Sequence, residues 1–296
     1  MSQQFRGTGI ALVTPFNEDG SIDFDGLRKV IEHDIKGGVE YLVSLGTTGE
    51  TATLNKDEKL QVLRFTAEVV NKRVPLVAGF GGNDTRELVE AIKGFDFVGY
   101  DALLSASPYY NKPTQEGIYQ HYKAVAEASP VPVILYNVPG RTSSNVTAET
   151  TLRLGRDFKN IIAVKEASGN FDQVMQIIKN KPDGFLVISG DDLITLPLIA
   201  CGADGVISVV GNAMPAYFSE MVRLALKGDF IAARKLHYKL TDLTNLLFVE
   251  GNPGGVKTVL QLKGICTNQV RLPLWRISNE LIKKLEAELH IINQAQ

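Results

Sequence analysis

Cysteine, histidine and excess charge of either sign are scarce in this chain of 296 residues. Its two cysteines, Cys201 and Cys266, are too few for a disulfide framework or a four-cysteine zinc site, which favours a reducing compartment. Lys and Arg number 31 against 33 Asp and Glu, so the strongly basic face of a nucleic-acid-binding protein is not expected. No uncharged apolar stretch approaches the roughly 20 residues of a membrane span, and the first residues lack the apolar run of a signal peptide. We therefore expect a cytoplasmic protein without nucleic-acid or membrane partners.

Common signatures of metal and cofactor sites are also missing. No H-x-x-x-H pattern occurs, and the histidines are scattered through helical patterns, at His33, His121, His237 and His290. There is no G-x-G-x-x-G after the first apolar run, no G-x-x-x-x-G-K-[ST], and no G-x-S-x-G of a serine hydrolase. The adjacent carboxylates Asp191 and Asp192 are expected to begin a helix rather than to form a catalytic diacid. The sequence thus predicts no metal and no organic cofactor.

The 44% of hydrophobic residues exclude a disordered chain and are arranged in a regular rhythm. Short apolar runs recur along the chain, at Gly9–Thr14, Tyr41–Ser44, Pro75–Gly79, Ala102–Ser105, Val133–Asn137, Ile161–Lys165, Leu186–Gly190 and Gly205–Val209. These runs are continuous rather than alternating, which is typical of parallel strands that are buried on both faces.

Helical patterns with start signals separate these runs. Capping boxes or close variants are read at Asn55-x-x-Glu58, Asp84-x-x-Glu87 and Asn170-x-x-Gln173, while Pro215 suits a first helical turn. Eight strand–helix pairs predict an α/β fold, a (β/α)8 TIM barrel over residues 1–228, with a doubly wound sheet as the alternative. A C-terminal helical domain is expected over 229–296, with helices at Phe230–Val249, Gly255–Lys263 and Ser278–Ile292.

Lys165 is the strongest catalytic candidate, because an active site in such a barrel lies at the carboxyl ends of the strands. The residue closes the apolar run Ile161–Val164, so its stem is expected among core side chains. Burial disfavours an ammonium ion, and a neutral amine can attack a carbonyl carbon to form a Schiff base. The alternatives are a lysine that reaches out to solvent or one that pairs with Glu166.

Other strand ends supply hydroxyls, backbone amides and one cation. Tyr136 ends the fifth run and could exchange a proton with Lys165, or be a core tyrosine with a satisfied hydroxyl. The turn Gly46–Glu50 could direct amide groups at a carboxylate, or simply need glycine for its geometry. Arg141 suits bidentate capture of a carboxylate, although a surface ion pair is the commoner role.

Five motifs, in this order and spacing, connect the chain to a known family. They are GTTGE at Gly46–Glu50, SPYYNKPTQEG at Ser107–Gly117, YNVPGRT at Tyr136–Thr142, IIAVKEASGN at Ile161–Asn170 and SGDD at Ser189–Asp192. Over nearly its whole length the chain resembles the dihydrodipicolinate synthase / N-acetylneuraminate lyase family of class I aldolases.

The resemblance implies a set of catalytic roles. Lys165 corresponds to the lysine that forms an imine with pyruvate. Tyr136, Thr47 and Tyr110 correspond to the proton-relay triad of the family, with Tyr110 reaching in from a neighbouring subunit. The implied assembly is a homotetramer built as a dimer of dimers.

The resemblance also implies substrate-binding roles. Thr48 corresponds to a ligand of the pyruvate carboxylate, Arg141 to the residue that holds the carboxylate of the aldehyde, and Gly190 and Ile207 to positions that line the pocket. The implied reaction condenses pyruvate with L-aspartate 4-semialdehyde in diaminopimelate and lysine biosynthesis, without a metal or cofactor. An N-acetylneuraminate or 2-keto-3-deoxy sugar acid lyase with the same imine chemistry is the alternative. A non-catalytic barrel that senses oxo acids is more remote, since it would not need both Lys165 and Tyr136.

Some family members are inhibited by lysine at a separate site. The resemblance places an effector site of this kind at Thr51, Ala52, Asn83, Glu87 and Tyr109. Lys56 and Lys59, however, stand where inhibitable members often carry histidine. Two cations near a cationic ligand are unfavourable, so weak or absent inhibition by lysine is expected.

Overall fold

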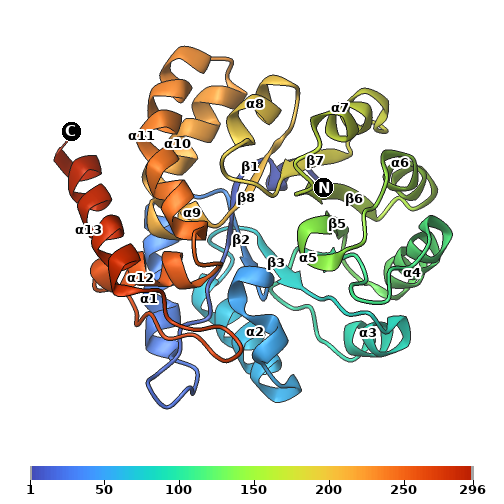
Figure 1. Ribbon diagram of the computed structural model, residues 1–296. Coiled ribbons are helices and arrows are strands. Elements are labelled where there is room, and N and C mark those ends of the chain that lie inside the picture. Colours follow the sequence, from blue (N-terminus) through green and yellow to red (C-terminus); the bar gives the residue numbers. More distant parts are fainter. Residues whose placement is uncertain (1, 295–296) are drawn as a thin grey trace.

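The computed structural model describes residues 2–294 and contains a closed barrel of parallel strands (Figure 1). The strands pair in chain order, and β1 closes the ring against β8. Their bounds are β1 Gly7–Ala11, β2 Tyr41–Ser44, β3 Leu76–Gly79, β4 Ala102–Ala106, β5 Val133–Asn137, β6 Ile161–Glu166, β7 Leu186–Ser189 and β8 Gly205–Ser208. The predicted TIM barrel is therefore confirmed, and the doubly wound alternative is wrong.

Helices surround this barrel, as Figure 1 shows in a view roughly along its axis. Those in the barrel region are α1 Phe24–Lys36, α2 Lys56–Val70, α3 Thr85–Lys93, α4 Gln115–Ala128, α5 Pro139–Thr142, α6 Ala148–Asp157, α7 Phe171–Asn180, α8 Thr195–Ala200, α9 Val210–Ala213 and α10 Pro215–Leu226. Those that follow are α11 Phe230–Phe248, α12 Gly254–Leu262 and α13 Asn279–Gln294. None of the described helices is long and apolar enough to cross a membrane.

Every strand residue faces either the barrel interior or the surrounding helices, which explains the continuous apolar runs. The barrel interior is narrow, and large side chains from neighbouring strands are crowded together in it. A side chain on Gly9 would place its Cβ 2.2 Å from the ring of Tyr41, so this strand needs glycine there. Tyr41 packs edge-on against Phe5, with ring centroids 5.5 Å apart, and donates a hydrogen bond to the carbonyl of Val206. These side chains fill the end of the barrel opposite to the strand carboxyl termini.

All four predicted helix starts are confirmed in position, since Pro215 stands in the first turn of α10 and Asn55, Asp84 and Asn170 precede α2, α3 and α7. Only α2 has a complete capping box, in which Asn55 and Glu58 each bond the backbone of the other. Asp84 and Asn170 cap α3 and α7 through their side chains alone. A side-chain cap supplies an acceptor to otherwise unpaired amides of the first turn, so it stabilises a helix even without the reciprocal bond.

Two local predictions were wrong. The first strand ends at Ala11 rather than Thr14, because the backbone amide of Val13 bonds the side chain of Asn212 instead of a neighbouring strand. Thr14, beyond the strand, donates its hydroxyl to the carbonyl of Gly49 in the next βα loop. Asp191 and Asp192 do not begin the helix after β7, since α8 starts at Thr195. Asp192 turns inward and accepts hydrogen bonds from amides that follow β8, and its burial raises the pKa of this carboxyl.

The C-terminal segment packs on one side of the barrel, where α11 contacts α10 and α13 contacts α11 (Figure 1). The observed helices lie within two residues of the predicted ranges. Leu243, Leu247 and Leu285 are buried in this region and share the core cluster of the outer barrel layer. A boundary between domains at 228/229 stays a prediction, because this apolar packing is continuous across it.

Candidate active site

Lys165 is a buried lysine on the inner face of β6, near the strand's carboxyl end. Its side chain is 5% exposed, and the strand register places it beside Tyr136 of β5 and Ile188 of β7. Ala163, two residues earlier, belongs to the cluster that fills the barrel interior, so alternation along the strand directs Lys165 inward as well. The lysine therefore does not reach out to solvent.

Glu166 points away from Lys165, toward the helical layer. Its carboxylate accepts hydrogen bonds from the side-chain amides of Asn137, at 3.0 and 3.1 Å, and of Gln173, at 2.9 Å, and from the backbone amide of Ser168, at 2.7 Å. These donors satisfy the buried carboxylate, so the ion pair with Lys165 that the sequence left open is not formed. The network instead ties β6 to β5 and α7 directly behind the lysine.

Tyr136 lies against Lys165. The Nζ atom of Lys165 is 4.2 Å from the centre of the Tyr136 ring, and the tyrosine is 6% exposed. An aromatic face at this distance attracts a cation and shields it from water. The pair thus brings an amine and a phenol together in a nearly dry environment.

Gly190 gives the lysine its space. A Cβ added at Gly190 would lie 2.7 Å from the Cβ of Ala167, 3.0 Å from the Cε of Lys165 and 3.2 Å from its Cγ. Ile207, on the inner face of β8, is 1% exposed and belongs to the same interior cluster as Tyr136. The sequence alone could not show that Gly190 contacts Lys165, since Gly190 follows β7 whereas Lys165 lies in β6.

Thr47 and Thr48 come from the opposite wall of the barrel, because β2 lies four strands from β6 in the closed ring. Both lie in the short 3₁₀ helix η2, Thr47–Gly49, that follows β2. Thr47 is exposed, whereas Thr48 is buried and its hydroxyl accepts a hydrogen bond of 3.0 Å from Asn252. Sequence reasoning treated Asn252 only as part of a helix break.

Arg141 and Tyr110 lie outside the buried group. Arg141 is exposed on the short helix α5, which follows β5. Tyr110 is 88% exposed, with its backbone in the left-handed region at a φ of 72°. The single chain therefore does not bring the Tyr110 side chain into contact with Lys165 or Tyr136.

Of the five residues predicted for the effector site, a hydrogen bond joins two to each other. Asn83 donates a hydrogen bond to the backbone carbonyl of Tyr109, at 3.2 Å. Thr51 directs its hydroxyl at the carbonyls of its own loop, while Ala52 and Glu87 are exposed. Lys56 is exposed at the start of α2, and Lys59, one turn later, is half-buried.

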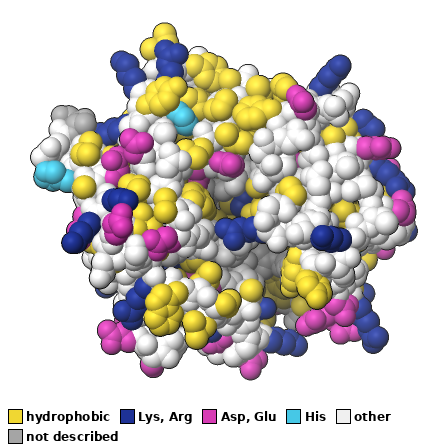
Figure 2. Space-filling view, viewed as in Figure 1, with side chains coloured by type: hydrophobic (Ala, Val, Ile, Leu, Met, Phe, Trp, Pro, Cys, Tyr) yellow, Lys and Arg dark blue, Asp and Glu magenta, His cyan; other side chains and the backbone are white. Residues whose placement is uncertain are grey.

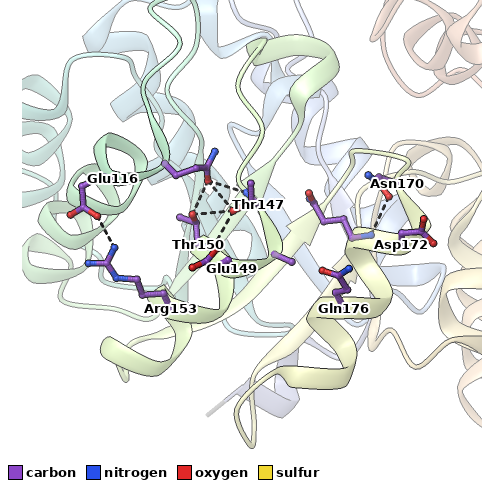
Figure 3. Close-up of a pocket in the computed structure, with 11 residues that line it drawn as sticks. Glu116, Thr147, Glu149, Thr150, Arg153, Asn170, Asp172 and Gln176 are labelled. Atoms are coloured by element: carbon purple, nitrogen blue, oxygen red, sulfur yellow. Dashed lines mark hydrogen bonds and ion pairs between the residues drawn. The ribbon is translucent and has the colours of Figure 1, made fainter.

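A groove of about 550 Å³ on the outside of the barrel is a separate feature (Figure 3). It lies between α4, α6 and α7, and an ion pair of 2.6 Å joins Arg153 to Glu116 beside it. It lies on the helical side of β6, so Lys165 faces away from it. Figure 2 shows a different hollow, near the centre of the face that Figure 1 presents, with Lys or Arg side chains beside it.

Within residues 2–294, no three His, Cys, Asp or Glu side chains are grouped so that they could hold a metal ion. The chemistry that the buried group itself offers is therefore that of an amine, a phenol and hydroxyls. A lysine with a neighbouring proton carrier is the arrangement expected for covalent catalysis on a carbonyl compound.

Comparison with known proteins identifies relatives over nearly the whole chain. A 4-hydroxy-tetrahydrodipicolinate synthase of Phocaeicola vulgatus is 56% identical over 287 residues, which are 97% of each chain. That of Parabacteroides distasonis is 57% identical over 91% of each chain.

Solved structures give the same result. A dihydrodipicolinate synthase of Acinetobacter baumannii, solved in complex with pyruvate, is 41% identical and superimposes with a TM-score of 0.94, covering 97% of this chain and 99% of that one. The enzyme from Cyanidioschyzon merolae, solved with lysine bound, is 37% identical with a TM-score of 0.94 over 98% and 99% of the two chains. The family model described as the dihydrodipicolinate synthetase family matches residues 4–292. The chain therefore belongs to the dihydrodipicolinate synthetase family.

Proposed function

We propose that this chain condenses pyruvate with L-aspartate 4-semialdehyde, as its relatives named 4-hydroxy-tetrahydrodipicolinate synthase do, through an imine on Lys165. The observation that carries the proposal is the position of Lys165, buried at the inner carboxyl end of β6 against the ring of Tyr136. The reaction serves diaminopimelate and lysine biosynthesis.

The chemistry begins at the amine. The lone pair of Lys165 Nζ attacks the keto carbon of pyruvate, and loss of water leaves a protonated imine. Loss of a proton from the methyl carbon gives an enamine, and this carbon then attacks the aldehyde carbon of the second substrate. The amino group of that substrate finally attacks the former keto carbon and releases Lys165 as the ring closes. The protonated imine accepts the electrons in this sequence, so the proposal needs no metal or organic cofactor.

Each step that forms or cleaves the imine moves protons, and we assign Tyr136, whose ring lies against the amine, as the first carrier. We assign Thr47 as the next member of the relay, since it is exposed on the loop that follows β2. Tyr110 is assigned as the third member, acting in the site of a second copy of the chain. Its 88% exposure supports that role, because the side chain is free to enter a neighbour.

Four further residues are assigned to substrate binding. Thr48 would hold the pyruvate carboxylate through its amide and hydroxyl, and Arg141 would pair with the carboxylate of the aldehyde substrate. Gly190 and Ile207 would line the pocket around the imine. The closeness of Gly190 to the Lys165 stem supports this assignment, since only a hydrogen leaves space beside the amine.

We also propose a cytoplasmic homotetramer arranged as a dimer of dimers. The shared site around Tyr110 requires at least a dimer, and the 46% exposure of Tyr109 suits the same contact. The scarcity of cysteine, which favours a reducing compartment, supports the proposed cytoplasmic location.

Reduction with borohydride in the presence of pyruvate tests the proposal. The imine would become a stable secondary amine, which peptide mass mapping should locate on Lys165. Lys165→Ala should abolish turnover, and Tyr136→Phe should slow it by roughly 10²–10⁴-fold, as for a lost proton-transfer group. An adduct on another lysine, or none, would refute the assignment. Comparing turnover of aspartate semialdehyde with that of N-acetylneuraminate then separates the synthase from the lyase.

A further inference from the structure

The loop that carries Thr47 and Thr48 has an unusual backbone. Leu45 and Glu50, the residues before and after its central turn, both have left-handed conformations, with φ values of 59° and 53°. Residues other than glycine and asparagine seldom adopt this backbone conformation, because it costs free energy. It persists where surrounding contacts offset that cost. Contacts with other parts of the chain must therefore hold this loop in place.

Glu50 forms a completely buried ion pair with Lys257 of α12. The exposed fraction of both side chains is zero, and Lys257 also donates a hydrogen bond of 2.7 Å to the carbonyl of Gln269. The second carboxylate oxygen of Glu50 accepts from the backbone amide of Arg271, at 3.0 Å. Phe16 covers the cation, its ring centre lying 4.3 Å from Lys257 Nζ. The C-terminal segment thus holds the residue that ends the loop.

Two neighbouring loop residues are held from outside as well. Gly49 accepts a hydrogen bond from the hydroxyl of Thr14, at 2.7 Å, and Thr48 accepts one from Asn252. Consecutive residues 48, 49 and 50 are thereby anchored, while Thr47 stays exposed. Contacts that fix residues 48–50 also fix the orientation of Thr47 at the start of the turn. Supporting contacts around an active site hold its functional groups in this way.

We propose that Glu50 and Lys257 are positioning residues for the pyruvate-binding loop, so that the C-terminal helical segment sets the affinity for pyruvate. The inference rests on the proposed function, because it assumes that Thr48 binds the pyruvate carboxylate. Neither residue needs to touch the substrate. Their pairing holds the left-handed conformation at Glu50 and, through it, the orientation of the Thr47 and Thr48 groups.

The test compares Glu50→Gln with the double variant Glu50→Gln/Lys257→Met. The double variant leaves no unpaired buried charge, which is the usual reason for collapse when such a pair is broken. With both substrates varied, we expect KM for pyruvate to rise at least about tenfold, since misplacement by about 1 Å can cost 10²-fold. KM for aspartate semialdehyde should stay within about twofold, as that substrate is assigned to Arg141. The pyruvate concentration that half-saturates borohydride labelling of Lys165 should rise in parallel.

Lys181→Met is the matched control. It breaks a largely buried ion pair of 2.7 Å with Asp204, which precedes β8 at the other end of the barrel. It should lower the melting temperature without changing either KM. The inference is overturned if both Glu50 variants keep the wild-type KM for pyruvate, or if both KM values rise equally and do so in Lys181→Met too. A wild-type protein that forms no adduct on Lys165 would instead defeat the proposed function itself.

Discussion

The sharpest prediction concerns Gly190→Ala, because the structure shows what the added methyl group meets. The new Cβ would lie 2.7 Å from Ala167 Cβ and 3.0 Å from Lys165 Cε. Carbon atoms in contact rest about 3.5–4.0 Å apart, so the groups must separate by roughly 0.8 Å at the closest point. The Ala167 methyl is short and cannot turn aside, so this contact must shift the backbone of Ala167, which follows Lys165 by two residues. The contact of 3.0 Å with Lys165 Cε displaces the flexible lysine stem directly, by roughly 0.5 Å. Both displacements should move the amine of Lys165.

The expected effect of Gly190→Ala on stability and on rate follows from two general magnitudes. Overpacking of a filled site costs about 1–3 kcal/mol of unfolding free energy, which a stable barrel tolerates. Displacing a reacting group by about 1 Å can lower the rate about 10²-fold. Gly190→Ala should thus stay folded while kcat/KM for pyruvate falls by about two orders of magnitude.

The assay combines steady-state kinetics, borohydride labelling of Lys165 and thermal unfolding. Gly82→Ala is the matched control, since the nearest atom to its added Cβ lies 4.0 Å away, and it should keep the wild-type rate. A folded Gly190→Ala protein with the wild-type kcat/KM would show that the reasoning about Lys165 is wrong.

Three further predictions concern stability and regulation. Burial lowers the pKa of His121 from 6.5 to about 4, so between these pH values the unfolded chain binds a proton that the folded chain excludes. The unfolding free energy should fall by about 3 kcal/mol as pH drops through this window. His121→Gln should remove that part of the slope in urea unfolding curves, and an unchanged slope would exclude the effect. Asn55→Ala should cost about 1 kcal/mol in the same assay, through loss of the α2 cap. In a steady-state titration, lysine should inhibit weakly or not at all, since Lys56 and Lys59 oppose a cationic ligand; strong inhibition would contradict this.

The elements that could be read from the sequence are those set by local patterns. Two-sided burial made the strands continuous and apolar, and the Asn55 cap is a local bond within four residues. The errors occurred where a distant partner decided the outcome. Asp192 was assigned to a helix start because its bonds to the residues after β8 are invisible in sequence. Thr14 was placed in the first strand because the bond from the amide of Val13 to the distant side chain of Asn212, beyond which the strand does not continue, is invisible in sequence.

The sequence by itself determined the barrel and the helices that follow it, and it singled out Lys165 and Tyr136 as the candidates for the reactive pair, because period and motif are properties of neighbouring residues. Only the tertiary structure decided the surroundings of that pair. It turned Glu166 away from Lys165, placed the bare Cα of Gly190 against the lysine stem, and buried Lys257 beneath the loop that ends at Glu50. These contacts join residues from 7 to 207 positions apart, and the long-range ones exist only because closing the barrel brings the strand ends together.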